Sequence, residues 1–268
     1  MADLLELKDV SALRAGKRAL DRVSLRIRAK ENVAIIGPNG SGKSTLIKLL
    51  TRELYPVAIE GPFTLKLLGR ERWELQELRK HLGIVSPDLQ ADFSREMTGL
   101  EAVVSGLFGS VGLPQGGPPS RTASAWPPDS PEWRRARRAL ERVGAEHLAE
   151  RWMTEMSSGE ARRILIARAL IHEPEALLLD EPTTSLDFRS HLEFRATTRK
   201  LAKAGTSILL VTHMLEDVIP EIGRVILLRC GKVFRDGPAE EVLSSDTLSE
   251  LFETRVRLER HDGVWRLQ

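Results

Sequence analysis

Apolar and polar residues alternate in the first part of the chain. Over residues 4–28, apolar side chains recur at roughly every second position, first at Leu5 and Leu7 and later at Leu25 and Ile27. Alternation of this kind is typical of strands that bury one face and expose the other. The pattern predicts two or three half-buried strands in this stretch.

Three later runs are almost entirely apolar. They cover Val33–Ile36, residues 176–179 and residues 207–211. Continuous runs this short are typical of strands buried on both faces of a parallel sheet. Polar residues follow each run: a glycine-rich loop, then an acidic pair, then Thr212 and His213. Because ligands of open α/β sheets bind beyond the carboxyl ends of the strands, we expect these groups to line one edge.

The middle of the chain is different. Gly, Pro and Ser dominate residues 107–131 (LFGSVGLPQGGPPSRTASAWPPDSP), which predicts a long flexible loop. Residues 132–150 then predict a helix, and its apolar face would be formed by Trp133, Ala136, Leu140, Val143 and Leu148. A solvated basic face and a docking surface for another protein both fit the arginines on the other faces. These are Arg134, Arg135, Arg137, Arg138 and Arg142.

The composition is that of a globular protein. The 268 residues are 41% hydrophobic and 29% charged, which is normal for a protein with a substantial core. This length fits one compact domain with a subdomain inserted into it. The 40 basic and 38 acidic residues leave a net charge of +2, so no overall field argues for a nucleic-acid partner.

Cysteine content and hydropathy indicate the compartment. The single cysteine, Cys230, excludes an internal disulfide framework and suits a reducing cytosol. No run of about 18 consecutive apolar residues is present, so no membrane span is predicted. The N-terminal MADLLELKDV carries acids where a signal peptide needs bases. We therefore expect a cytoplasmic protein that is at most peripheral to a membrane.

The stretch GPNGSGKST fits the phosphate-loop pattern G-x-x-x-x-G-K-[ST] between a buried strand and a helix. Its glycines let backbone N–H groups approach phosphate oxygens, and the N-terminus of the following helix favours negative charge. Lys43 is expected to reach the β- and γ-phosphates, and Ser44 to bind Mg²⁺ through its hydroxyl. The expected nucleotide contacts are Gly37, Pro38, Asn39, Gly40, Ser41, Gly42, Lys43, Ser44 and Thr45.

The acidic pair Asp180 and Glu181 suits hydrolysis of a phosphate bond. An aspartate there can hold Mg²⁺ directly or through water, and the next carboxylate can orient or deprotonate an attacking water. Acids also follow buried strands for no catalytic reason, so the catalytic interpretation of this pair depends on the phosphate loop upstream. A lone histidine is more often structural, but the strand-end position of His213 favours contact with the γ-phosphate.

The stretch MSSGEARRILIARAL, residues 156–170, predicts a capped helix. Ser157, Ser158 and Gly159 can cap a helix that starts near Glu160, and Pro174 stops it. Its buried stripe would be formed by Ile164, Ala167, Leu170 and Ile171.

The same stretch resembles the signature motif L-S-G-G-Q of ATP-binding-cassette (ABC) ATPases. ALLLDEP at residues 176–182, SLD at residues 185–187 and the switch-like His213 extend the resemblance, together with the phosphate loop. It thus covers nearly the whole chain. It implies an α/β fold: a P-loop NTPase core with a mostly parallel sheet, an N-terminal antiparallel β-subdomain and an inserted α-helical subdomain.

The resemblance also implies boundaries and site residues. The single ABC domain of residues 1–268 would have its core at about 1–85 and 157–268 and its helical subdomain at about 86–156. The resemblance implies catalytic roles for Glu181, His213 and Lys43. It implies further nucleotide contacts by Arg14, Ser157, Ser158, Gly159 and Asp187. It implies magnesium contacts by Ser44, Gln90 and Asp180.

Some positions depart from the family pattern. Ser158 replaces the first glycine of the signature, and Glu160 replaces its glutamine. The aromatic residue that usually stacks on adenine is absent, and Arg14 occupies about that position. A guanidinium plane can stack on a base. The Q-loop glutamine normally follows a strand like Leu82–Val85 directly, whereas here four residues intervene before Gln90.

Each ATP in this family lies between the phosphate loop of one subunit and the signature of the other. The chain carries one of each, so the resemblance implies a head-to-tail dimer on two ATP–Mg²⁺, most simply of identical chains. Such a dimer would drive a separate membrane permease from the inner face of the membrane. The alternatives are a soluble ABC ATPase acting on ribosomes or nucleic acid, and a regulatory protein that binds ATP without turnover.

Two further stretches bear on these alternatives. The tail VFRDGPAEEVLSSDTLSELFETRVRLERHDGVW resembles the ends of importer ATPases that serve metal-chelate or metal-oxyanion permeases. LGIVSPDLQADF and LEAVVSGLFGSVGL resemble a subgroup related to molybdenum-transport ATPases. The tail favours the transporter interpretation. The permease partners of the second subgroup are often unclear, so that likeness belongs with the soluble alternative. Intact Glu181 and His213 argue against a protein without turnover.

Overall fold

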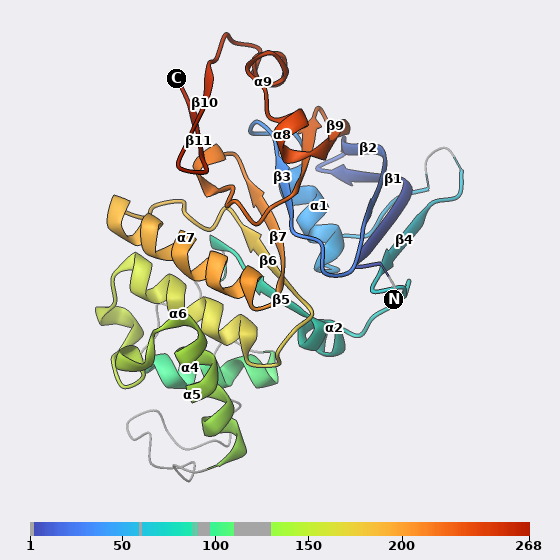
Figure 1. Cartoon of the computed structure of the whole chain (residues 1–268). Helices are drawn as coiled ribbons and strands as arrows, with labels where there is room; N and C mark the ends of the chain where they lie inside the picture. The colour runs from blue at the N-terminus through green and yellow to red at the C-terminus, as the bar shows by residue number, and fades with distance from the viewer. Residues whose placement is uncertain (1–2, 59–60, 88, 90–96, 110–129) are drawn as a thin grey trace. The chain divides into compact units, whose positions relative to one another are not determined.

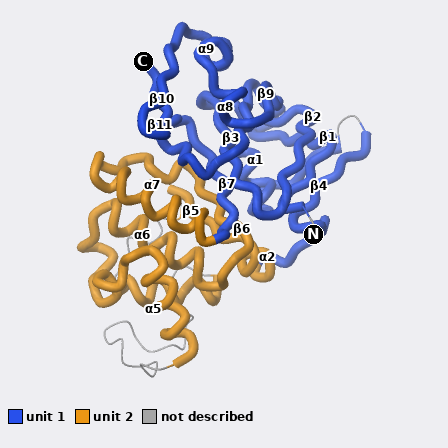
Figure 2. Tube along the Cα trace, in the orientation of Figure 1, with its two compact units in different colours: residues 1–75, 205–268 blue, residues 76–204 orange. Residues whose placement is uncertain are grey.

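The fold is given by a computed structural model that describes residues 3–58, 61–87, 89, 97–109 and 130–268. These residues cluster into two units (Figure 2). Unit 1 comprises residues 1–75 and 205–268, and unit 2 comprises residues 76–204. Unit 1 is therefore built from both ends of the chain, and unit 2 is inserted between them in the sequence.

The N-terminal strands form an antiparallel sheet in unit 1 (Figure 1). β1 (Leu5–Arg14) lies between β2 (Lys17–Ile27) and β4 (Thr64–Leu67) and pairs with both. Leu5 and Leu7 of β1 are buried, and polar side chains alternate with them. The predicted half-buried strands and the N-terminal antiparallel sheet are confirmed.

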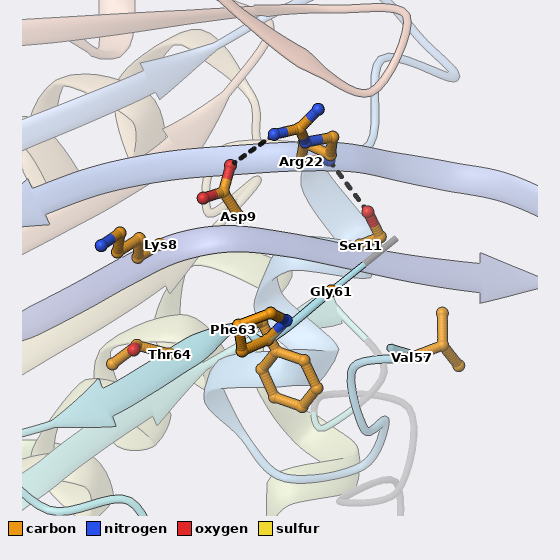
Figure 3. A pocket seen from close by; sticks show the side chains of 9 residues that line it. Lys8, Asp9, Ser11, Arg22, Val57, Gly61, Phe63 and Thr64 are labelled. Carbon is orange, nitrogen blue, oxygen red and sulfur yellow. Dashed lines mark hydrogen bonds and ion pairs between the residues drawn. The ribbon is translucent and has the colours of Figure 1, made fainter. Parts of the chain in front are cut away.

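Irregular pairing interrupts the register between β1 and β2. Asp9 and Arg22 adopt φ angles of 51° and 50°, and the pairing shifts on both sides of Val10. Because bulges turn side chains out of strict alternation, the Asp9 carboxylate approaches the Arg22 guanidinium, with 3.5 Å between Oδ1 and Nη2 (Figure 3). The Arg22 backbone N–H donates to Ser11 Oγ at 3.0 Å. These shifts explain why the alternation along the sequence is only loose.

A second group of strands in unit 1 is mostly parallel. In order across the group they are β7 (Ser207–Thr212), β3 (Val33–Ile36), β8 (Arg224–Arg229) and β9 (Lys232–Pro238). β3 runs parallel to β7 and β8, and β9 is antiparallel to β8. Every residue of β3 and β7 is buried, as predicted for strands covered on both faces. Ile36 lies beside Thr212 and Leu227, so these strands end at one edge.

The turn between β8 and β9 joins three parts of unit 1. It contains the exposed Cys230 and the buried Gly231. The backbone N–H of Gly231 donates to the carbonyl of Ser41 at 2.9 Å, and the carbonyl of Gly231 accepts from the backbone N–H of Asp21 at 2.9 Å. This turn therefore links the loop after β3 to the antiparallel sheet.

Shorter elements complete unit 1. They are α1 (Lys43–Leu50), η5 (Leu215–Asp217), α8 (Ala239–Val242), α9 (Ser245–Phe252), β10 (Leu258–His261) and β11 (Val264–Leu267). β10 and β11 form an antiparallel hairpin. The side chain of Arg260 lies over the Trp265 ring at 4.8 Å from its centroid, a cation–π contact.

Unit 2 contains a parallel strand pair covered by helices. Its elements are α2 (Leu75–His81), β5 (Leu82–Val85), α6 (Ser158–Leu170), β6 (Ala176–Asp180) and α7 (Phe188–Lys203). Val85 lies beside Leu179 in the register of β5 and β6. A Cβ on Gly83 would come within 2.6 Å of the Ala169 carbonyl oxygen, so α6 packs closely on β5. The predicted α/β fold with mostly parallel strands is confirmed.

The remaining described helices of unit 2 are α4 (Gly99–Val104), η1 (Ser105–Phe108), α5 (Pro131–Val143), η3 (Glu146–Leu148) and η4 (Met153–Glu155). The prediction of one helix over residues 132–150 was wrong. Gly144 adopts a φ of 65° and caps α5, because glycine takes the left-handed conformation without steric cost. Leu148, predicted on the same helical face, belongs to η3 and is buried.

Residues 110–129 of the predicted loop lie outside the described residues. Leu107 and Phe108 belong to η1, and Pro131 starts α5. The arginines at 134, 135, 137 and 138 are exposed on α5, and one of them, Arg137, approaches Glu150 at 3.9 Å. In the part of the chain that the structure describes, no helix has the length and apolar character needed to cross a bilayer.

Substitution of Trp133 should show how α5 is held. Trp133 is 4% exposed, so Trp133→Ala is expected to lower the free energy of unfolding by about 3–5 kcal/mol. Its neighbour Arg134 is exposed, and Arg134→Ala is expected to change it by no more than about 0.5 kcal/mol. Urea unfolding of both variants measures the difference. Equal midpoints would contradict the packing described here.

Candidate functional site

The phosphate loop lies between β3 and α1 and is shaped by close backbone contacts. A Cβ on Gly37 would lie 2.4 Å from the Leu228 carbonyl oxygen, and one on Gly42 would lie 2.8 Å from the Ala19 carbonyl oxygen. Gly42 also has a φ of 108°, which side chains with a Cβ rarely adopt. These contacts hold the loop against β8 on one side and β2 on the other.

The side chains of the loop separate into buried and exposed sets. Ser41, Lys43 and Thr45 are buried, whereas Asn39 and Ser44 are exposed. The Lys43 ammonium donates to the carbonyl oxygens of Gly37 at 2.7 Å and Pro38 at 3.2 Å. Lys43 therefore folds back across its own loop, which is the position from which a lysine can reach a bound phosphate.

The start of α1 suits an anion. Its N-cap is Gly42, no side chain caps it, and its first turn contains no acidic residue. The first N–H groups of a helix have no partner within the helix and carry partial positive charge. Close glycine contacts and an uncapped helix start therefore fit a nucleotide phosphate.

Arg14 lies at the tip of the β1–β2 hairpin. It is exposed and pairs with Lys17 across a turn formed by Ala15 and Gly16. The start of β2 touches the phosphate loop, because the Cβ position of Gly42 falls 2.7 Å from Leu20 Cδ2. The structure thus brings the hairpin that carries Arg14 to the loop. Its stacking on adenine stays a prediction.

His213 follows β7 at the same edge. The register of β3 and β7 sets Ile36 beside Thr212, so His213 comes directly after a residue that flanks the start of the loop. Two buried side chains hold this turn: the Thr212 hydroxyl donates to the Asp217 carboxylate at 2.7 Å and accepts from the Met214 backbone N–H at 3.0 Å. Thr212 was predicted at this edge, but sequence reasoning missed Asp217, because a single polar residue outside a motif carries no signal.

A cavity in unit 1 is separate from these residues. It has a volume of about 310 Å³ and is lined by Lys8, Ser11, Arg22 and Phe63 among others (Figure 3). None of the residues predicted to bind nucleotide lines it. The candidate site is therefore defined by the loop and strand ends, not by this hollow on the antiparallel sheet.

The acidic pair belongs to unit 2. Asp180 ends β6, and Glu181 follows with a φ of 40° and intermediate exposure. Arg162 of α6 is 3% exposed and is near enough to sense the charge of Asp180. Burial lowers the pKa of the Arg162 guanidinium, and the Asp180 carboxylate opposes that shift. Gln90 lies outside the described residues.

The signature stretch forms a capping box. Ser157 is the N-cap of α6, and its Oγ accepts from the Glu160 backbone N–H at 3.2 Å. Glu160 Oε2 accepts from the Ser157 backbone N–H at 2.9 Å, and its other oxygen binds Arg151 at 2.6 Å. The cap was predicted; the helix starts at Ser158, two residues earlier than predicted. Glu160, a departure from the family motif, acts here as a capping residue.

The signature also packs against the start of α7. A Cβ on Gly159 would lie 2.3 Å from Ser190 Oγ, so glycine permits this close approach. The Ser158 hydroxyl donates to the Ser185 carbonyl at 3.4 Å. Asp187 caps α7 by accepting from the Ser190 backbone N–H at 2.7 Å. Unit 2 thus brings together the predicted signature and SLD residues, with Ser157, Ser158 and Asp187 exposed.

Two carboxylates of this cluster titrate below their ordinary range. Backbone hydrogen bonds lower the pKa of Glu160, through Ser157, and of Asp187, through Ser190. A lowered folded pKa means that the charged form is favoured on folding. Their stabilisation is therefore present at neutral pH and is lost as the pH falls through those lowered values.

These features define a nucleotide-binding α/β protein of the phosphate-loop class. The model of the ABC transporter family matches residues 20–184, and the chain belongs to that family. It is an ATP-binding protein and an ABC-type ATPase.

Two relatives span nearly the whole chain. The uncharacterized ABC transporter ATP-binding protein YlmA of Bacillus subtilis (strain 168) is 35% identical over 260 residues, which cover 95% of this chain and 93% of YlmA. The hemin import ATP-binding protein HmuV of Bradyrhizobium diazoefficiens is 33% identical over 272 residues, which cover 98% of this chain and 94% of HmuV.

Solved structures show the same fold. The ADP conformation of MJ1267, an ATP-binding cassette of an ABC transporter, aligns with a TM-score of 0.76 at 26% identity and covers 94% of this chain and 99% of that one. The dimeric structure of MJ0796, a bacterial ABC transporter cassette, has a TM-score of 0.66 at 26% identity and covers 87% of this chain and 98% of that one.

Substitution of Gly42 tests whether the close contacts of this glycine, in addition to its backbone conformation, are needed for ATP binding. Gly42→Ala would place a Cβ 2.7 Å from Leu20 Cδ2 at a φ of 108°. We expect ATP affinity to fall by about tenfold or more, a free-energy loss of at least about 1.4 kcal/mol, because the loop must move. Titration calorimetry measures the affinity.

The matched control is Gly144→Ala. Gly144 has a φ of 65° and nothing within 4 Å of its Cβ position. This variant should lose about 1–2 kcal/mol of stability from strain and keep its ATP affinity. Unchanged ATP binding in Gly42→Ala would contradict the described loop.

Proposed function

We propose that the protein is an ATP-hydrolysing transporter subunit that works as a head-to-tail pair of identical chains on two ATP–Mg²⁺. The exposed signature end carries this proposal. Ser157, Ser158 and Asp187 are presented to solvent by two helix starts that pack on each other in unit 2. The phosphate loop belongs to unit 1 of the same chain. A second copy would offer its phosphate loop to the signature of the first.

Each predicted residue has a defined task in such a pair. Lys43 and the start of α1 bind the β- and γ-phosphates. Ser44 and Asp180 would hold Mg²⁺, with Gln90 as a further predicted contact, and the ion would supply positive charge against the phosphates. Glu181 orients the attacking water and accepts its proton, and His213 donates a hydrogen bond to the γ-phosphate.

The signature would complete the site from the other chain. Ser157 and the N-terminus of α6 approach the γ-phosphate, where a hydroxyl and a helix dipole stabilise negative charge. Cleavage of the γ-phosphate removes those contacts, and the pair opens. Closing and opening of the pair is the motion that a transporter uses.

We assign this motion to a separate membrane permease, with the ATPase bound at the inner face of the membrane. The likeness to a hemin import protein over 98% of the chain supports an importer for a metal chelate. Other chains would recognise the solute. Its proposed chemical class therefore rests on the similarity to the hemin import protein and on the tail of this sequence.

Glu181→Gln is expected to trap the closed pair. The amide cannot accept a proton from water, so ATP is bound but turnover stops. Sizing chromatography with ATP and Mg²⁺ should show a species of twice the 30.0 kDa chain mass. A chain that stays monomeric with ATP while the wild type turns over normally would count against the whole scheme.

The control for that experiment is Lys43→Ala. Loss of the buried ammonium should abolish tight nucleotide binding, and this variant should then remain monomeric when ATP is added. Unchanged affinity would remove Lys43 from its assigned role.

Purification of the tagged chain from its native membranes tests the transport assignment. We expect a membrane-spanning permease to copurify in detergent, and the complex to show solute-dependent ATPase activity. A pull-down that contains ribosomes or RNA and no permease would favour the soluble alternative instead.

A further inference from the structure

The segment that carries His213 has little regular structure of its own. Residues 213–223, the switch segment, join β7 to β8 and are all described, and η5 is their one regular element. A single helical turn is not stable alone, because its hydrogen bond does not offset the entropy of fixing its backbone. Leu215, Val218 and Ile219 are at most 1% exposed. Packing against other elements therefore determines where the switch segment lies.

The C-terminal hairpin of β10 and β11 packs on the switch segment (Figure 1). β11 contacts η5, and Trp265 is the buried residue of β11, at 9% exposure. The hairpin turn meets the switch segment at a second point, because a Cβ on Gly263 would lie 3.1 Å from Pro220 Cγ. The hairpin thus touches the switch segment at η5 and again beyond it.

The hairpin is itself anchored by elements outside the switch segment. The backbone N–H of Leu258 donates to Ser245 Oγ of α9 at 2.9 Å. Arg260 lies over the Trp265 ring at 4.8 Å from its centroid, and its guanidinium donates to Glu240 of α8 at 2.7 Å. Trp265 is therefore held in place from α8 and α9, and it can act as a fixed support for η5.

Hydrogen bonds join η5 to the end of β7. Asp217, the last residue of η5, is 1% exposed and accepts from the Thr212 hydroxyl at 2.7 Å. The same hydroxyl accepts from the Met214 backbone N–H at 3.0 Å. His213 lies between Thr212 and Met214 and is exposed. The position of His213 therefore depends on a turn that η5 holds.

We propose that the C-terminal hairpin, through Trp265, is the support that positions His213 for the γ-phosphate. The inference rests on the proposed function, in which His213 donates a hydrogen bond to that phosphate. Trp265 is a positioning residue: it holds η5, and η5 holds the turn that contains His213. Because a displacement of about 1 Å can lower a catalysed rate by about 10²-fold, loss of this support would slow turnover.

ATP hydrolysis by the full-length chain with Mg²⁺ tests the proposal. Trp265→Ala should lower kcat by about tenfold or more. The KM for ATP should be unchanged, because the phosphate loop is held by β2 and β8 and not by the hairpin. Trp265→Phe keeps an aromatic ring at this position and should restore most of kcat. A wild-type kcat for Trp265→Ala would overturn the inference.

A His213→Ala background shows whether the hairpin acts through the histidine. Two substitutions that act through one group are not additive, so Trp265→Ala should cause no further loss of kcat once His213 is replaced. An equal loss in both backgrounds would overturn the inference. A His213→Ala chain that hydrolyses ATP like the wild type would instead refute the proposed role of His213, and the inference would fall with it.

Amide hydrogen exchange gives a readout that does not need turnover. In Trp265→Ala the amides of residues 213–217 should exchange faster, because their local opening becomes easier, while those of the phosphate loop should keep their wild-type rates. Unchanged exchange over residues 213–217 would overturn the inference even where His213→Ala leaves too little hydrolysis to compare.

The matched control is Trp73→Ala. The Trp73 ring also lies under an arginine, Arg70, at 4.8 Å from its centroid, but it follows β4 in the chain and is not part of the hairpin. This control should keep the wild-type kcat and the wild-type exchange of residues 213–217. Equal slowing in Trp73→Ala would show a general loss of stability and overturn the inference.

Gly263→Ala is the second variant, in case Trp265→Ala does not fold. A Cβ there would press on Pro220 at a φ of 75°, and a displacement of a few tenths of an ångström should lower kcat by about threefold. Its control is Gly144→Ala, which has a φ of 65° and nothing within 4 Å of the Cβ position, and which should keep its kcat. Equal kcat values for these two variants would contradict the inference.

Discussion

The lack of space around two loop glycines is the constraint on which the nucleotide side of this protein depends. Gly37 faces the carbonyl of Leu228, and Gly42 faces the carbonyl of Ala19, each closer than a methyl group allows. The loop is therefore held closely between β8 and β2, by these backbone carbonyls and by the Leu20 side chain. Because β2 belongs to the antiparallel sheet, the same contact fixes the hairpin that carries Arg14 beside the loop. The positions of the phosphate loop and of the hairpin with Arg14, the predicted adenine contact, are thus set by one piece of packing.

The signature side is built from short polar contacts. Ser157 and Glu160 satisfy each other's backbone N–H groups. Asp187 accepts from the Ser190 backbone N–H at the start of α7, and Gly159 lets the two helix starts touch. A glutamate in place of the usual glutamine changes the charge of the motif yet preserves the reciprocal cap. The departure is therefore compatible with a rigid helix start, and the exposed serines remain available to another chain.

Much of this architecture follows from the sequence because it rests on local rules. The buried runs at β3, β6 and β7 and the cap at Ser157 are decided by apolar continuity and by short-range hydrogen bonding. The end of α5 was misjudged because apolar periodicity continues to Leu148, while Gly144 stops the helix through its backbone conformation. Asp217 was missed because its role depends on a turn that brings its carboxylate to the Thr212 hydroxyl, and no motif along the chain reveals that contact.

The turn at Cys230 and Gly231 offers a means of observing the phosphate loop directly. Gly231 is bonded to Ser41 in the loop and to Asp21 in β2, and the adjoining thiol is exposed. Since Cys230 is the single cysteine of the sequence, a thiol-reactive fluorophore would attach at one known place. The native chain therefore carries its own labelling position next to the loop, and loop rearrangements can be followed optically without introducing a cysteine or removing one.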